Sequence, residues 1–185
     1  MNRHEFVARP EDCMLLIIDI QQAMLKVIET WEDVARAVNQ LTQAAEVLGI
    51  PILLTEHYSK GLGKTIPEVI DRISAPKVFH KEHFSACLEP DFLSLIGSYH
   101  RNKIVLVGME THVCVLQTGL DLIKQNYQVH LVADGIASRT TQNRDIAIDL
   151  FREAGAIITS PEIVIFQWAR RANTEDFRKI LPIVK

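Results

Sequence analysis

The chain has 185 residues, and 20 Lys and Arg residues stand against 23 Asp and Glu residues, which gives a formal net charge of −3. Because a typical domain has roughly 150 residues, this length predicts one domain over residues 1–185. Hydrophobic residues make up 48% of the chain and charged residues 23%, a composition that excludes a disordered or fibrous protein. A small negative charge without a basic block argues against a nucleic-acid partner.

The sequence also argues against a membrane or a secreted location. Outside the expected strands the longest apolar run, residues 163–166, is far shorter than the roughly 20 residues of a membrane span. The first ten residues lack the apolar stretch of a signal peptide. Cys13, Cys87 and Cys114 are too few, and odd in number, for a disulfide framework. We therefore expect a cytoplasmic protein with no membrane partner.

Short segments rich in Ile, Val and Leu, without alternation, are typical of strands that are buried on both faces of a sheet. They are residues 14–19, 51–55, 103–108, 128–133 and 156–159, and a weak sixth strand is expected around Val78 and Phe79. Helical patterns alternate with these strands, at residues 31–48, 88–99, 113–126 and 143–153. This order predicts an α/β protein with three α/β/α layers and a doubly wound, mainly parallel sheet.

Two more helices are expected after the last strand. Ser160 and Pro161 predict a helix over residues 162–170, with Ser as its N-cap and Pro in its first turn. This helix is apolar almost all the way round, so it should be buried, either in the core or at a subunit interface. Asn173 or Thr174 should then cap a final amphipathic helix through Ile180.

Three chemically useful residues follow strands of this sheet. Ligands of open α/β sheets bind at the carboxyl ends of the strands, and Asp19, Lys81 and Cys114 all lie just beyond such ends. Each has an ordinary interpretation when taken alone: a capping carboxylate, a surface ammonium and a small buried thiol. Their placement at one edge of the sheet favours a common role.

Together these residues have the properties of an acyl-transfer site. A helix N-terminus and a nearby ammonium lower a thiol's pKa, so Lys81 should favour the Cys114 thiolate. Asp19 can act as general base for the thiol and for water, and as general acid for a leaving amine. Backbone N–H groups at the start of the helix can stabilise an oxyanion.

The residues around these three form a recognisable pattern. Asp19-Ile20-Gln21, Lys81 with Phe84-Ser85, and the run Gly-Met-Glu-Thr-His-Val-Cys-Val over residues 108–115 resemble the three motifs of the isochorismatase-like cysteine hydrolases. The resemblance extends from about Pro10 to near the C-terminus. Additional segments, such as residues 55–58 and 133–135, resemble the small isochorismatase-domain-containing proteins.

The resemblance implies a role for each residue that matches a motif. Asp19 is the acid and base, Lys81 is its electrostatic partner, and Cys114 is the nucleophile. A cis peptide between Met109 and Glu110 is implied, with the backbone N–H groups of Glu110 and Cys114 as oxyanion donors.

The same pattern marks a substrate pocket and limits the chemistry. The expected pocket residues are Gln21, Glu56, Tyr58, His83, Phe84 and His112. Nicotinamidases of this superfamily hold a divalent metal with an Asp-x-His pair and a further His, whereas this chain has Glu56-His57-Tyr58, so neither a metal nor a cofactor is expected. Enzymes that cleave isochorismate itself lack a nucleophilic Cys, so Cys114 favours an amide-like substrate.

The sequence thus predicts a homo-oligomeric cysteine hydrolase that cleaves the C–N bond of a small molecule through a thioester. Two alternatives remain open. One is a catalytically silent oligomeric binding or scaffold protein, and the other is a metal-dependent nicotinamidase.

Overall fold

The computed structural model describes residues 4–185 and contains a six-stranded sheet with the order β3-β2-β1-β4-β5-β6. Every pair of neighbouring strands is parallel. The strands are β1 (Cys13–Ile18), β2 (Ile52–His57), β3 (Val78–Lys81), β4 (Lys103–Met109), β5 (Gln128–Ala137) and β6 (Ile157–Thr159). The predicted parallel sheet is confirmed, including its weak strand at residues 78 and 79.

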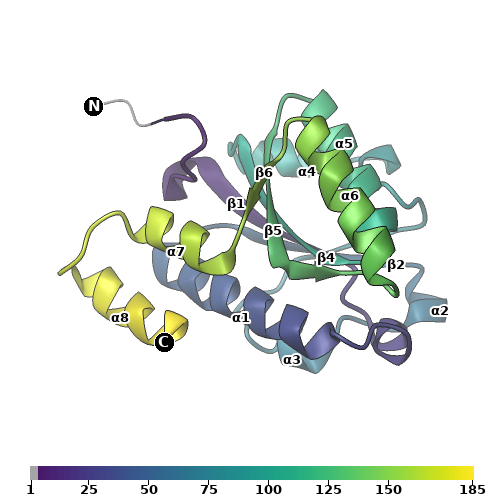
Figure 1. Ribbon diagram of the computed structural model, residues 1–185, viewed down its shortest axis with the longest axis horizontal. Helices are drawn as coiled ribbons and strands as arrows, with labels where there is room; N and C mark the ends of the chain where they lie inside the picture. Colours follow the sequence, from purple (N-terminus) through teal and green to yellow (C-terminus); the bar gives the residue numbers. More distant parts are fainter. Residues whose placement is uncertain (1–3) are drawn as a thin grey trace.

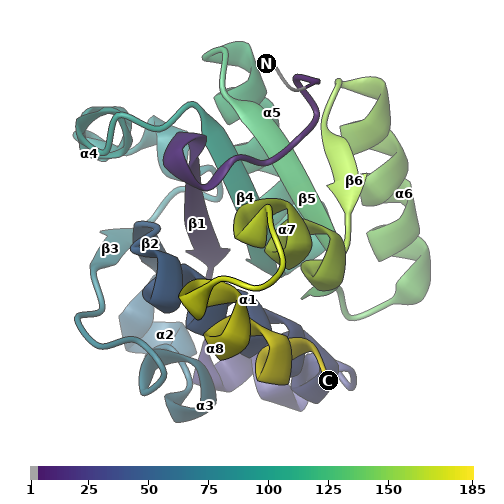
Figure 2. The ribbon, with the colours of Figure 1, turned by 90° about the vertical axis from the view of Figure 1, so that its left-hand side faces the viewer.

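Helices cover both faces of the sheet, which makes three layers (Figures 1 and 2). The helices are α1 (Trp31–Leu48), α2 (Ser59–Leu62), α3 (Pro67–Ile70), α4 (Phe92–Ser98), α5 (Leu116–Lys124), α6 (Thr141–Glu153), α7 (Pro161–Ala169) and α8 (Glu175–Val184). Helices α1, α7 and α8 lie on one face, and α4, α5 and α6 lie on the other (Figure 1). Four tighter or wider turns connect these elements, η1 (Pro10–Asp12), η2 (Gln22–Lys26), η3 (Ala86–Leu88) and η4 (Thr111–Val115).

The sheet has a hydrophobic core on each side, and β1 contributes to both. Leu15 and Ile17 pack in the core under α1, α7 and α8. Leu16 and Ile18 pack in the core under α4, α5 and α6. Because successive side chains of a strand point to opposite faces, a strand buried on both faces must be apolar throughout. This requirement explains the continuous apolar segments of the sequence.

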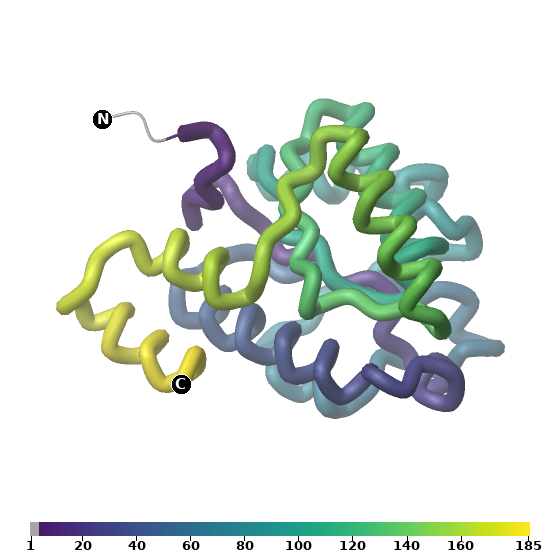
Figure 3. Tube along the Cα trace, viewed as in Figure 1, coloured from purple at the N-terminus to yellow at the C-terminus, as the bar shows by residue number. Residues whose placement is uncertain are grey.

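Two helices distant in the chain lie side by side. The path of the backbone brings α8, at the C-terminal end, alongside α1 (Figure 3). The side-chain amide of Gln40 in α1 donates to the carbonyl of Ile183 in α8, at 3.1 Å. Within residues 4–185, no helix is long and apolar enough to span a membrane.

Several predicted boundaries differ from the observed ones. The helix expected from residue 88 starts only at Phe92, because Asp91 just before it has a left-handed backbone with φ of 69°. The helix expected from residue 113 starts as the wide turn η4 and becomes α-helical at Leu116. The last helix starts after the Thr174 cap as predicted, but it continues past Ile180 through Pro182.

Helix α7 is only half buried. Ser160 caps it and Pro161 occupies its first turn, as predicted. Val164, Ile165 and Trp168 are buried in the core, whereas 52% of Ile163 and 41% of Phe166 are exposed. One face of this apolar helix therefore packs in the core, and whether a second subunit covers the other face stays a prediction.

Candidate active site

The candidate site lies where the winding direction of the sheet reverses. From β1 the chain proceeds outward through β2 and β3, then returns to β4 on the other side of β1. The carboxyl ends of β1 and β4 are the position at which ligands bind in such sheets. Ile18 and Gly108 are paired there. Gly108 has φ of 139°, and a Cβ atom on it would lie 2.1 Å from the carbonyl oxygen of Ile18, so only glycine allows the two strands to approach here.

Asp19 is held rigidly directly after β1. It is 2% exposed and has a left-handed backbone with φ of 50°, a conformation that non-glycine residues adopt rarely and often at functional sites. One carboxylate oxygen accepts a hydrogen bond from the hydroxyl of Thr55 at 2.6 Å. The other forms an ion pair with the Lys81 ammonium at 2.7 Å.

Lys81 ends β3, and its side chain is fully buried. Its ammonium also donates to the backbone carbonyls of His83 and Phe84, each at 3.2 Å. The loop after β3 therefore curls around the ammonium. Buried charges are stable only when paired and hydrogen-bonded, and Lys81 and Asp19 meet that requirement for each other.

Cys114 lies in η4 and is 6% exposed. Burial, together with the charge and hydrogen bond of Asp19, raises the pKa of its thiol to about 12, although Lys81 acts in the opposite direction. Lys81 thus lowers this pKa as expected, but the expected net lowering is wrong, because desolvation outweighs the ammonium. Near neutral pH the group is therefore a thiol, and the Asp19 carboxylate is hydrogen-bonded to it.

The loop between β4 and Cys114 is fixed by two side-chain contacts. The peptide bond between Met109 and Glu110 is cis. The Glu110 carboxylate is 4% exposed and accepts hydrogen bonds from the backbone N–H of Arg139 at 3.0 Å and from its guanidinium at 2.6 Å. Two residues later, the Nδ1 atom of His112 lies 2.9 Å from the hydroxyl of Ser138.

Burial alone would raise the pKa of Glu110, but the hydrogen bonds and the charge of Arg139 outweigh it and hold that pKa below its usual value. Glu110 is therefore a carboxylate at neutral pH. Its backbone carbonyl also accepts from the N–H groups of Val113 and Val115, at 3.1 and 3.3 Å. Glu110 thus forms the base of the turn that carries Cys114.

Two of the predicted pocket residues are engaged within the protein. The Gln21 amide is buried, donates to the carbonyls of His57 and Gly63 at 3.0 and 2.6 Å, and accepts from the His57 N–H at 2.8 Å. The Glu56 carboxylate is also buried and accepts from the N–H and the hydroxyl of Thr65, at 2.7 and 2.9 Å. These contacts fix the segment that follows β2.

Aromatic side chains flank the site on the side of β2 and β3. Tyr58 and Phe84 are 53% and 51% exposed, and the Phe84 ring lies 5.3 Å from the ring of His57. Burial and the neighbouring Lys81 ammonium lower the pKa of His57. The predicted pocket residue His83 points to Glu89, with its Nδ1 atom 2.9 Å from that carboxylate.

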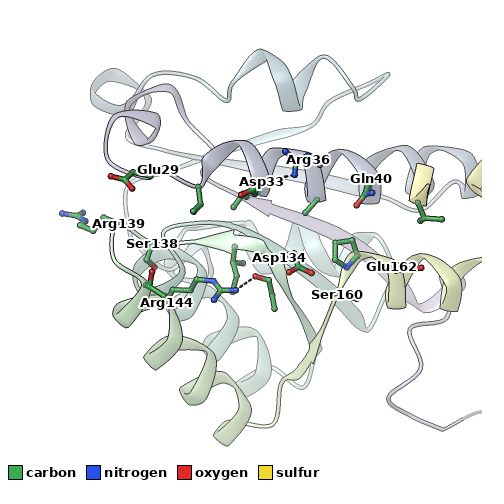
Figure 4. A pocket seen from close by; sticks show the side chains of 18 residues that line it. Glu29, Asp33, Arg36, Gln40, Asp134, Ser138, Arg139, Arg144, Ser160 and Glu162 are labelled. Carbon is green, nitrogen blue, oxygen red and sulfur yellow. Dashed lines mark hydrogen bonds and ion pairs between the residues drawn. The ribbon is translucent and has the colours of Figure 1, made fainter. Parts of the chain in front are cut away.

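Two cavities near the site are lined by neighbours of Cys114 and not by Cys114 itself. One of about 360 Å³ is lined by Glu56, Tyr58 and Lys81 among others. The larger, of about 780 Å³, lies between α1 on one side and the ends of β5 and β6 on the other. Figure 4 shows Ser138, Arg139 and Arg144 on one wall and Asp33 and Arg36 on the opposite wall.

The metal-dependent alternative requires a cluster of metal-ligating side chains. In the part of the chain that the structure describes, residues 4–185, no group of three or more His, Cys, Asp or Glu side chains is arranged to hold a metal ion. The ring of His57 packs against Phe84.

These features define a three-layer α/β protein with a buried Asp, Lys and Cys constellation at the switch point of its sheet. Residues 13–163 match the model of the Isochorismatase domain. The chain belongs to the isochorismatase family.

Curated relatives and solved structures agree with this assignment. The chain is 36% identical over 180 residues to the secreted isochorismatase effector Isc1 of Phytophthora sojae, covering 95% of this chain and 86% of the relative. It is 33% identical over 178 residues to the mouse isochorismatase domain-containing protein 2A, covering 95% and 84%. The structure of the MAR1 ribonuclease of Caenorhabditis elegans superimposes with a TM-score of 0.89 at 32% identity, covering 95% of this chain and 91% of that one.

Sequence reasoning did not identify three of the residues that shape this site. They are Thr55, Ser138 and Arg139. Thr55 could have been found, because it is a polar residue in an otherwise apolar strand. Ser138 and Arg139 lie in a polar segment before α6, where such residues are ordinary, so only the tertiary structure reveals their contacts with the Cys114 loop.

Proposed function

We propose that this protein is a cysteine hydrolase of small amide-like substrates that acts through a thioester intermediate. The buried ion pair between Asp19 and Lys81, whose charges act on the Cys114 thiol, carries this proposal. A buried thiol with a raised pKa is inert unless a base accepts its proton, and Asp19 supplies that base. The Lys81 ammonium forms an ion pair with that carboxylate.

In the first half of the reaction the Cys114 sulfur attacks the substrate carbonyl while its proton passes to Asp19. The resulting oxyanion is stabilised by backbone N–H groups, for which Glu110 and Cys114 are the proposed donors. The intermediate collapses, the C–N bond breaks, and Asp19 returns the proton to the leaving amine. A thioester on Cys114 and a free amine are the products of this half.

In the second half a water molecule attacks the thioester, and Asp19 takes a proton from that water. The C–S bond breaks, the acid leaves, and the proton returns to sulfur. We assign Tyr58, Phe84, His83 and His112 to the substrate pocket. Gln21 and Glu56 support its wall through their backbone partners.

Self-association and location are further parts of this proposal. Four exposed apolar side chains support a homo-oligomer. They are Ile163 and Phe166 on α7, and Ile146 and Leu150 on α6. Sedimentation of the purified protein as a monomer would contradict self-association.

The three free cysteines fit a reducing compartment such as the cytoplasm. Imaging of the tagged chain in its own cells tests that location.

The test is a panel of small amides, including nicotinamide, assayed with and without a chelator. We expect hydrolysis that resists the chelator in the wild-type protein and is lost in the Cys114→Ala variant, which should fold normally because it removes one sulfur atom. Cys87→Ala is the matched control and should retain full activity. Undiminished turnover by Cys114→Ala would refute the thiol mechanism, and loss of activity on chelation would favour the metal-dependent alternative.

Because the similar C. elegans structure is named a ribonuclease, RNA is also tested as a substrate. A net charge of −3 gives little attraction for a phosphate backbone, which favours a small substrate. Incubation with single-stranded RNA should therefore give no cleavage that depends on Cys114. Cleavage that disappears in Cys114→Ala would replace the amide by a phosphodiester in the proposed function.

A further inference from the structure

Two adjacent residues after β5 hold the loop that carries the proposed nucleophile. Arg139 binds the carboxylate of Glu110 at the start of that loop, through its backbone N–H and through a two-pronged guanidinium contact. Ser138 bonds His112, two residues before Cys114. The contacts come from one short segment and reach two points of the loop, so the loop cannot shift without breaking at least one of them.

The chemistry of these contacts suits a positioning role. The Glu110 carboxylate is 4% exposed, whereas the Arg139 side chain is 59% exposed. A planar guanidinium that binds both oxygens of a carboxylate fixes direction as well as distance. The exposed guanidinium thus pairs with the buried carboxylate of Glu110. This contact also fixes the orientation of the Glu110 backbone N–H, which is a proposed oxyanion donor.

We infer that Arg139 is a positioning residue for the Cys114 loop and that Ser138 assists it through His112. This inference rests on the proposed function, because it assigns Arg139 to the same reaction. Arg139 acts through Glu110 and the backbone, and not on the substrate. Displacing catalytic groups by about 1 Å can cost roughly 100-fold in rate, so a loosened loop should reduce turnover strongly.

The first test is the kinetics of Arg139→Gln on an amide that the wild-type protein hydrolyses. We expect kcat to fall by roughly 10- to 100-fold while KM changes by less than about threefold. Arg139→Lys keeps the charge and one donor and should recover part of kcat. The matched control is Arg36→Gln, which removes an arginine from the opposite wall of the same cavity, where its partner is Asp33, and it should behave as wild type.

The second test needs no turnover and uses iodoacetamide, with the three cysteines followed separately by mass spectrometry. Cys114 is almost covered in the wild-type protein, so a loosened loop should speed its alkylation in Arg139→Gln and in Ser138→Ala. Cys13 is fully buried in β1 and reports global unfolding. We expect the alkylation of Cys114 to rise several-fold while that of Cys13 is unchanged.

These outcomes separate the inference from the proposed function. Equal acceleration of Cys13 and Cys114 would make Arg139 a residue of general stability and overturn the inference. An unchanged kcat and unchanged Cys114 alkylation in Arg139→Gln would also overturn it. Failure of the proposed function has a different signature, since turnover would then survive Cys114→Ala, and Cys114 alkylation would still report whether Arg139 holds the loop.

Discussion

Cys114 is the residue whose environment differs most from what the sequence led us to expect. Desolvation, reinforced by Asp19, raises the pKa of its thiol to about 12. In the proposed reaction its proton is therefore removed during the attack on the substrate and not before it. This arrangement protects the thiol from oxidation and alkylation between turnovers, because the thiolate is the reactive form.

A substitution at Asp19 should therefore have opposite effects on reactivity and on catalysis. Asp19→Asn removes the charge that raises the Cys114 pKa, so we expect faster alkylation of Cys114 at pH 8, together with loss of amide hydrolysis for want of an acid and base. Rates of alkylation by iodoacetamide between pH 7 and pH 10 measure the shift. Asp121→Asn is the matched control, because Asp121 raises the pKa of Cys87 in the same way, and it should accelerate Cys87 alone. Slower alkylation of Cys114 in Asp19→Asn would show that the Asp19 carboxylate does not raise the pKa of the Cys114 thiol.

At the scale of elements, the junction of β1 and β4 depends on one glycine. Gly108→Ala would place a Cβ atom 2.1 Å from a backbone oxygen, at a φ of 139° that alanine rarely adopts. We expect the free energy of unfolding to fall by more than about 1 kcal/mol, measured as the midpoint of urea denaturation. Gly97→Ala, at an exposed position of α4 with no atom within 4 Å of the added methyl group, should instead stabilise by roughly 0.5–1 kcal/mol. Equal stability of the two variants would mean that β1 and β4 can separate without cost.

Helices and strands were predicted well where a local sequence pattern determines them. Continuous apolar segments such as residues 103–108 identified the strands, because a strand buried on both faces must be apolar. Asp19 and Lys81 were found because strand ends can be read from the sequence and the topology brings them together. The burial of Cys114 and the contact between Arg139 and Glu110 depend on how α5, α6 and β5 pack, and no local pattern encodes that packing.

At the scale of the whole molecule, a buried histidine links folding to pH. His130 lies in β5 and is 1% exposed. Burial, with a contribution from the Lys103 ammonium, lowers its pKa to about 4, whereas the ordinary value is 6.5. Between these two values the unfolded chain binds a proton that the folded chain does not bind, so stability decreases as pH falls from about 6.5 toward 4.

Urea denaturation at pH 7 and at pH 5 measures this contribution. From the two pKa values the loss attributable to His130 is on the order of 2 kcal/mol over that interval. His130→Leu should remove this part of the pH dependence, whatever its effect on stability at pH 7. His4→Gln, at an exposed position, should retain it. A wild-type pH dependence in His130→Leu would assign the acid sensitivity to other groups.

The strand order has a consequence for how the chain acquires its structure during synthesis. The central strand β1 is made first, yet Cys13 pairs with Lys103, and Leu15 pairs with Ile52. Pairings between residues so distant in the chain form slowly and leave strand edges open in the meantime. Synthesis must therefore reach the end of β4 before β1 has both neighbours, and until then a nascent chain that carries Asp19 still lacks Cys114, the proposed nucleophile.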